Sequence, residues 1–125
     1  MKLIDTDVMI WYLRGNVKAK VIIENSPISM SDVVYMELLQ GMRNKQELAL
    51  FKTFIKERKI ECLPLTPEIT SRAIYFLELF VLSHGLRMAD ALIAATADIY
   101  SRTLITANDA HYRMISSLPI TVFRP

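Results

Sequence analysis

The stretch Lys2-Leu3-Ile4-Asp5-Thr6-Asp7 places two aspartates directly after a short apolar segment near the start of the chain. The apolar residues predict a buried strand, and Asp7 or Thr6 is expected to cap the helix that follows. A later apolar segment, Thr103-Leu104-Ile105-Thr106, is followed in the same way by Asn108-Asp109. The working site of a parallel sheet lies beyond the carboxyl ends of its strands. We therefore expect these polar residues to face one crevice.

Strands and helices alternate along the whole chain. Besides residues 2–5 and 103–106, strands are predicted at 28–30, 60–63 and 120–123, with helices at 6–14, 17–24, 32–43, 46–58, 67–84, 88–101 and 110–115. The strands are continuous apolar runs, which is typical of a sheet buried on both faces. The pattern predicts an α/β fold with a mostly parallel central sheet of about four to five strands, flanked by helices on both faces.

Length and composition limit the classes of protein to consider. The chain has 125 residues, of which 52% are hydrophobic, and this suffices for one domain covering residues 1–125. The formal net charge of +2 gives no large basic field. The lone Cys62 excludes an intrachain disulfide framework. Because Asp5 and Asp7 interrupt the first apolar segment and no apolar run is long enough to span a bilayer, we expect a cytoplasmic protein with no membrane association.

Two further acids lie on helices that the fold is expected to bury. Glu37 flanks an apolar arc of its helix, and Asp90 lies in the first turn of a helix that is apolar or small nearly all round. Removing several carboxylates from water is costly unless a cation compensates them. His84 and His111 lack zinc-ligand spacing, so an all-oxygen site for Mg²⁺ or Mn²⁺ is favoured.

Each acid also has a purely structural explanation. Asp90 would serve the amino end of its helix or pair with Arg87, and Asp7 would act as a helix cap. Asp109 would cap the short helix predicted after it. The four acid-bearing segments together favour a functional site over these separate explanations.

Four segments resemble those of PIN-domain ribonucleases, specifically VapC-type toxins, and the resemblance extends over essentially the whole chain. The segments are Ile4-Asp5-Thr6-Asp7-Val8-Met9-Ile10, Val33-Val34-Tyr35-Met36-Glu37-Leu38-Leu39-Gln40-Gly41, Ala89-Asp90-Ala91-Leu92-Ile93-Ala94-Ala95-Thr96-Ala97 and Leu104-Ile105-Thr106-Ala107-Asn108-Asp109. The resemblance implies a metal-dependent endoribonuclease that cleaves RNA and forms a homodimer. It also implies inhibition by a co-expressed VapB-type antitoxin.

The resemblance also implies roles for individual residues. Asp5 and Asp90 match the principal metal-binding acids of the family, and Glu37 matches its helix glutamate. The fourth position is Asn108 by spacing, whereas the nearest acid is Asp109, which leaves the number of tightly held metal ions open. We accordingly expect catalytic roles for Asp5, Glu37, Asp90 and Asp109, metal binding by Asp5 and Asp90 with Glu37, Asn108 and Asp109 as further candidates, and substrate contacts from Thr6, Thr106 and Arg87.

Two other functions compete with the nuclease. Asp5 and Asp7 on alternate residues after a strand would suit a haloacid-dehalogenase-type phosphotransferase, although Met9 and the lack of a phosphate-holding lysine motif disfavour it. The second alternative is a catalytically silent PIN-like interaction module. An apolar groove for a partner helix is a related expectation, built from Trp11, Tyr12, Tyr35, Met36, Leu39 and Met42.

Overall fold

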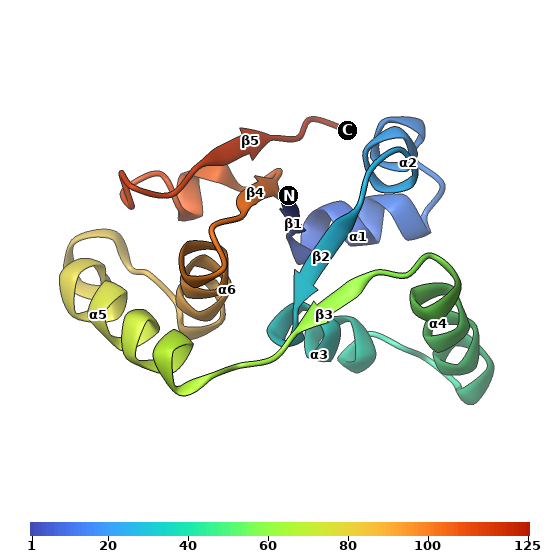
Figure 1. The fold of residues 1–125 in the computed structure, drawn as a ribbon, viewed down its shortest axis with the longest axis horizontal. Helices are drawn as coiled ribbons and strands as arrows, with labels where there is room; N and C mark the ends of the chain where they lie inside the picture. Colours follow the sequence, from blue (N-terminus) through green and yellow to red (C-terminus); the bar gives the residue numbers. More distant parts are fainter.

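A five-stranded sheet forms the centre of the computed structural model, which describes residues 1–125. Its strands are β1 (Lys2–Ile4), β2 (Ile28–Ser31), β3 (Glu61–Leu63), β4 (Thr103–Thr106) and β5 (Ile120–Val122). They lie in the order β3-β2-β1-β4-β5, and every neighbouring pair is parallel (Figure 1). The prediction of a mostly parallel sheet is confirmed, and all carboxyl ends of the strands meet at one edge.

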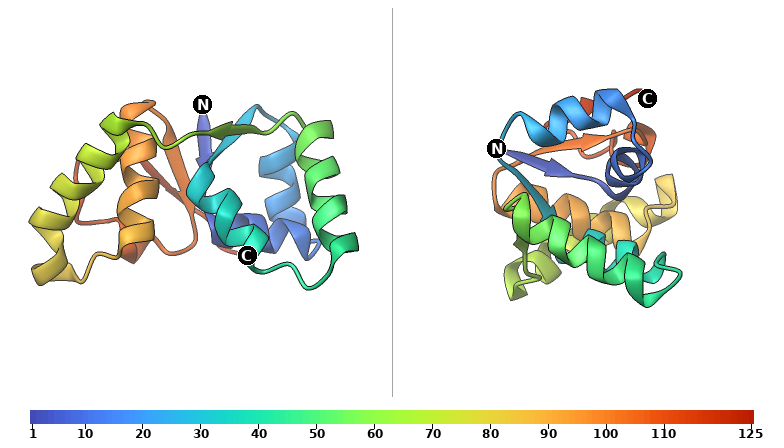
Figure 2. Two further views of the ribbon diagram at one scale, coloured as in Figure 1. Left: turned by 90° about the horizontal axis from the view of Figure 1, so that it is seen from below. Right: turned by 90° about the vertical axis from the view of Figure 1, so that its right-hand side faces the viewer.

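Helices connect the strands and cover both faces of the sheet. They are α1 (Thr6–Leu13), α2 (Val17–Glu24), α3 (Asp32–Gln40), α4 (Lys45–Glu57), α5 (Pro67–His84) and α6 (Met88–Ile99), with a 3₁₀ helix, η1, at Asp109–His111. In the right-hand view of Figure 2 the strands lie between α2 and α6, while α5 packs along α6. None of the helices has the length and apolar character needed to cross a membrane.

Capping residues explain where most helices begin and end. The Thr66 hydroxyl accepts a hydrogen bond from the Ile69 amide at 3.3 Å, Pro67 occupies the first turn of α5, and Gly85 ends it with φ +65°. Two predictions were wrong. The cap of α1 is Asp5 rather than Asp7 or Thr6, and the predicted helix at 110–115 is a single 3₁₀ turn followed by irregular turns.

The central strands β1 and β4 place the end of β1 inside the molecule. Leu3, Ile4, Leu104 and Ile105 are all buried, because helices cover both faces of the sheet. The amide of Asp5 donates to the carbonyl of Ile105 at 3.0 Å, just beyond the paired strands. Asp5 is thus held beside the carboxyl end of β4.

Candidate active site

Asp5 is the most buried acid at the carboxyl edge of the sheet, with only 6% of its surface exposed. Its Oδ1 accepts a hydrogen bond from the Thr6 amide at 2.8 Å. Its Oδ2 accepts hydrogen bonds from two hydroxyl groups, that of Thr106 at 2.8 Å and that of Tyr112 at 3.0 Å. Three elements of the fold therefore fix the orientation of this carboxylate.

Burial controls the ionisation of Asp5. Loss of hydration and, to a smaller extent, the nearby charge of Asp7 raise the pKa of its carboxyl to about 6, although the hydrogen bonds from Thr106, Thr6 and Tyr112 oppose the rise. These neutral donors do not fully replace the lost water. A cation beside Asp5 would favour its charged form.

Asp90 is joined to Asp5 through the hydroxyl of Tyr112. The Tyr112 hydroxyl lies 3.2 Å from Asp90 Oδ1, and His111 Nδ1 lies 3.3 Å from Asp90 Oδ2. Arg87, the alternative partner considered from the sequence, precedes α6 without a side-chain capping bond, and its guanidinium forms no ion pair with Asp90. Two acids that are far apart in the sequence thus share one buried hydroxyl.

Glu37 approaches the same edge from α3. Its Oε1 accepts the hydroxyl hydrogen of Thr6 at 2.7 Å, and Thr6 directly follows Asp5. The side chain is half-buried, as expected for a residue on the border of the core. The structure therefore gathers Asp5, Asp90 and Glu37 around the start of α1.

Asp7 ties the loop after β4 to helix α1. Its Oδ2 accepts the Ala107 amide at 3.0 Å and its Oδ1 accepts the Val8 amide at 2.7 Å. Burial raises the pKa of Asp7, although these backbone donors act against the rise. Asn108 follows Ala107 and has an exposed side chain. Its backbone amide donates a hydrogen bond to the Thr106 hydroxyl at 3.0 Å.

The carboxylate of Asp109 pairs with two arginines. It forms ion pairs with Arg113 and with Arg124, the latter at 3.0 Å, and the Arg113 hydrogen bond followed by that of Arg124 lowers the pKa of Asp109. Its side chain is not among the groups that contact Asp5, Glu37 or Asp90. The ion pairs give Asp109 a structural part in the loop, and its predicted catalytic role stays a prediction.

A family model described as "PIN domain" matches residues 2–116 of the chain. The chain belongs to the PIN-domain family. Two curated relatives from Mycobacterium tuberculosis are each 33% identical to it: "Ribonuclease VapC10" over 123 residues, covering 94% of this chain and 90% of the relative, and "Ribonuclease VapC19" over 124 residues, covering 94% and 97%.

Solved structures share the PIN fold over nearly the full chain. The VapBC2 complex from Rickettsia felis bound to a promoter DNA fragment gives a TM-score of 0.79 at 20% identity, covering 98% of both chains. A toxin–antitoxin complex from Klebsiella pneumoniae gives 0.78 at 23% identity, covering 98% of this chain and 97% of that one. At these identities the likeness establishes the fold.

The acids of this PIN domain offer the ligand chemistry that Mg²⁺ and Mn²⁺ prefer. Asp5 Oδ1 accepts a single hydrogen bond, and each oxygen of Asp90 has one polar neighbour, so each keeps lone pairs for a cation. The side chains do not already form a compact shell of three or more acidic, histidine or cysteine ligands. Mg²⁺ commonly binds through one or two carboxylates and keeps several waters, so the pair Asp5 and Asp90 fits such an ion.

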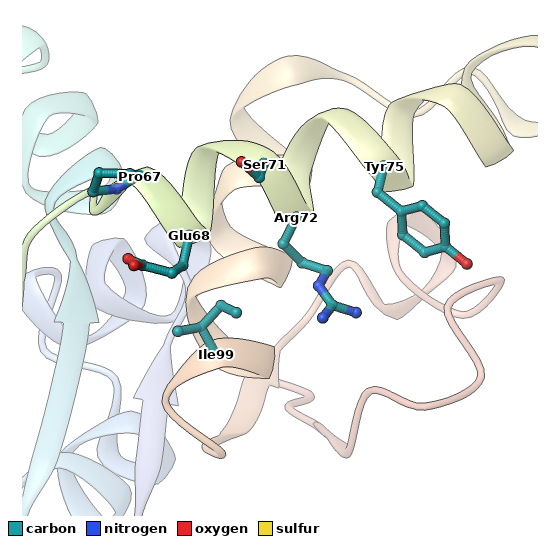
Figure 3. A pocket seen from close by; sticks show the side chains of 6 residues that line it. All are labelled: Pro67, Glu68, Ser71, Arg72, Tyr75 and Ile99. Atoms are coloured by element: carbon teal, nitrogen blue, oxygen red, sulfur yellow. The ribbon is translucent and has the colours of Figure 1, made fainter.

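One hollow of the PIN domain lies away from these acids. It measures about 610 Å³ and lies along α5 beside α6, where Glu68 and Arg72 point toward the side of Ile99 and Tyr75 lies further along the helix (Figure 3). None of the clustered acids lines it. A smaller hollow of about 190 Å³ is lined by Asp90 together with Arg87 and His111, whereas Asp5 and Glu37 do not line it.

Sequence reasoning missed Tyr112. It treated this residue as part of a short helix, and an isolated tyrosine in an irregular segment has no periodic pattern that marks it. The only available signal was its place shortly after Asn108, beyond the carboxyl end of β4. Thr6 and Thr106 were expected to contact the substrate. In the structure the Thr6 hydroxyl donates to Glu37 and the Thr106 hydroxyl donates to Asp5.

Proposed function

We propose that this PIN domain is a metal-dependent endoribonuclease and the toxin of a VapBC-type toxin–antitoxin pair. The observation that carries the proposal is the junction of Asp5 and Asp90 at one buried hydroxyl, with Glu37 linked through Thr6. Full-length relatives at 33% identity that are named ribonucleases VapC10 and VapC19 support it.

The acids divide the work of RNA hydrolysis. Asp5 and Asp90 would hold the cation, Glu37 would position the attacking water, and the side-chain carbonyl of Asn108 would complete the site from the rim. Mg²⁺ or Mn²⁺, when bound, supplies activation of water and stabilisation of the charge that develops on the phosphate. The hydrogen bonds to Asp5 keep its carboxylate oriented, so little rearrangement of the protein is needed during reaction.

Basic side chains near the acids are suited to hold the RNA backbone. Arg87 and His111 line the same hollow as Asp90. The exposed guanidinium groups of Arg113, in the loop after β4, and Arg124, after β5, lie at Asp109. Such groups bind phosphate with little dependence on base sequence. Arg87 keeps its proposed role in substrate binding, whereas Thr6 and Thr106 act by orienting the acids.

A VapB-type antitoxin is the partner that we assign to an apolar hollow between α1 and α4. This hollow of about 370 Å³ is lined mainly by Leu13, Met42, Leu50, Phe51 and Phe54. An amphipathic helix buries its apolar side in such a groove. Of the groove residues expected from the sequence, Met42 lines it.

Tyr12 belongs to the supporting packing of that groove rather than to its surface. Its ring packs against Phe54 with centroids 5.2 Å apart, and its hydroxyl donates to Glu24 at 3.0 Å. The homodimer remains part of the proposal, and the outer side of α5 is the surface that suits it. Leu82 there is 98% exposed, close to exposed Leu79 and Tyr75.

The phosphotransferase alternative has lost its basis. Membership of the PIN family does not support it, and both oxygens of Asp7 accept backbone amides, which leaves Asp7 poorly placed as a proton donor to a leaving group. A silent interaction module is distinguished from a nuclease by activity alone.

Cleavage of a mixed pool of structured RNAs tests the proposal. Purified protein, freed of any antitoxin, is incubated with Mg²⁺, Mn²⁺ or a chelator. We expect cuts at defined sites with either metal, none with chelator, and inhibition when a co-purified VapB-type protein is added back. A folded protein that binds Mn²⁺ without cutting RNA would contradict the nuclease and favour the silent module.

A further inference from the structure

Tyr112 stands out because its hydroxyl is the one side-chain group that contacts both Asp5 and Asp90. The residue has no exposed surface, and its hydroxyl lies 3.0 Å from Asp5 Oδ2 and 3.2 Å from Asp90 Oδ1. A buried tyrosine hydroxyl needs a partner in any fold. Here, however, the partners are two acids from separate parts of the fold, Asp5 after β1 and Asp90 on α6, which packing of the ring alone does not require.

The contacts of Asp5 show what the hydroxyl does. Oδ2 accepts hydrogen bonds from both Thr106 and Tyr112, which uses its lone pairs, whereas Oδ1 accepts only the Thr6 amide. The hydroxyls therefore turn the carboxylate so that Oδ1 is the oxygen left for another ligand. The segment after β4 also contacts both oxygens of Asp90. His111 lies beside Oδ2 and the Tyr112 hydroxyl beside Oδ1.

Charge makes this arrangement necessary. Asp5 and Asp90 repel each other when both are ionised, and no lysine or arginine forms an ion pair with either of them. The Tyr112 hydroxyl places a neutral donor between the two acids.

We propose that Tyr112 is a positioning residue that holds Asp5 and Asp90 in the geometry required for divalent-metal binding. The proposal rests on the proposed function and adds a residue to its site. Outer partners that orient metal ligands commonly change metal affinity by 10–100-fold when they are removed. Tyr112 acts through the two acids and does not itself take part in the reaction.

Tyr112→Phe removes the hydroxyl but keeps the buried aromatic ring, so it measures what the hydroxyl alone contributes to metal binding. Tyr12→Phe is the matched control, since it also removes a hydroxyl that donates to a carboxylate, that of Glu24. Mn²⁺ affinity is measured by electron paramagnetic resonance and calorimetry without RNA. We expect Tyr112→Phe to weaken binding about tenfold or more and Tyr12→Phe to leave it at the wild-type value.

Thermal unfolding in chelator shows whether Tyr112→Phe is folded. If it is not, the ¹³Cζ resonance of Tyr112 in the wild type provides the test, and we expect it to shift on saturation with Mg²⁺ while that of Tyr12 does not. Unchanged or tighter Mn²⁺ binding by folded Tyr112→Phe, or a Tyr112 resonance insensitive to Mg²⁺, would overturn the inference. If wild-type protein binds no Mn²⁺, the metal-dependent function itself fails, and this inference fails with it.

Discussion

The hydroxyl of Thr106 donates to Oδ2 of Asp5 at 2.8 Å and thereby joins the carboxyl ends of β4 and β1. The two residues are 101 positions apart in the sequence. Their strands are neighbours in the sheet, so the contact is a direct result of the fold. The contact orients Asp5, which is the most buried acid at this edge and therefore most needs a counter-charge.

Thr106→Val tests the energetic value of this contact. Valine has nearly the shape of threonine but leaves Asp5 without one of its donors. We expect the free energy of unfolding near pH 7 to fall by about 1–3 kcal/mol, as measured by urea denaturation. Thr103→Val, at the start of the same strand and without a side-chain hydrogen bond, is the control and should have a smaller effect. Equal losses in both variants would contradict a specific role for the Thr106 hydroxyl.

Stability in the absence of metal should depend on pH through Asp5. Its pKa rises from 3.8 in the unfolded chain to about 6 in the folded one, mainly through burial. The folded state therefore binds the proton more tightly, and the contribution of Asp5 to stability decreases as the pH rises between these two values. Asp7 acts in the same direction.

Asp5→Asn isolates that contribution. Between pH 4 and pH 6.5 in chelator, we expect the wild type to lose about 2 kcal/mol more of its unfolding free energy than Asp5→Asn. Chemical denaturation at several pH values provides the measurement. Parallel pH profiles for the two proteins would show that Asp5 does not have a raised pKa.

Asp109→Asn and Asn108→Ala distinguish the two candidates for the fourth site residue. We expect Asp109→Asn to reduce thermal stability, because it removes the charge that pairs with Arg113 and Arg124, while Mn²⁺ affinity stays close to that of the wild type. Asn108→Ala should reduce RNA cleavage without a comparable loss of stability. Loss of Mn²⁺ binding by a fully stable Asp109→Asn would instead support the catalytic role predicted from the sequence.

Leu13→Glu tests the antitoxin groove. Leu13 is exposed and lines the hollow between α1 and α4, so a buried charge would oppose docking of an apolar helix. Calorimetric titration with the co-purified VapB-type protein should show an affinity at least about tenfold lower, equivalent to 1.4 kcal/mol. Val21→Glu, an exposed position on α2 outside the hollow, is the control. Equal affinities for Leu13→Glu and the wild type would rule out this surface.

The sequence predicted the parts of the site that depend on strand ends. Asp5 follows the first apolar run and Asn108-Asp109 follow the run that ends at Thr106, so parallel pairing was expected to bring both to one edge. The structure pairs β1 with β4 and joins Asp5 to Thr106 there, whereas Asp109 pairs with Arg113 and Arg124. The loop after β4 was less predictable. Whether Asp109 faces the acids or Arg124 depends on how the distant C-terminal segment returns, and local periodicity contains no information about that contact.

The function of Tyr112 was beyond prediction for a related reason. Its burial is common for an aromatic residue, and only the three-dimensional meeting of β1, α6 and the loop after β4 places its hydroxyl between two acids. Asp5 as the cap of α1 was missed because Asp7 and Thr6 offered equally good capping side chains.

The most direct test of the central claim is the single-turnover rate of RNA cleavage at saturating Mn²⁺ by the wild type, Asp5→Asn, Asp90→Asn and the double variant. If the two acids hold one reactive metal site, each single variant loses about 100-fold or more, and the double variant loses little beyond that because the residues act as a unit. Folded single variants that retain wild-type cleavage rates would contradict the account.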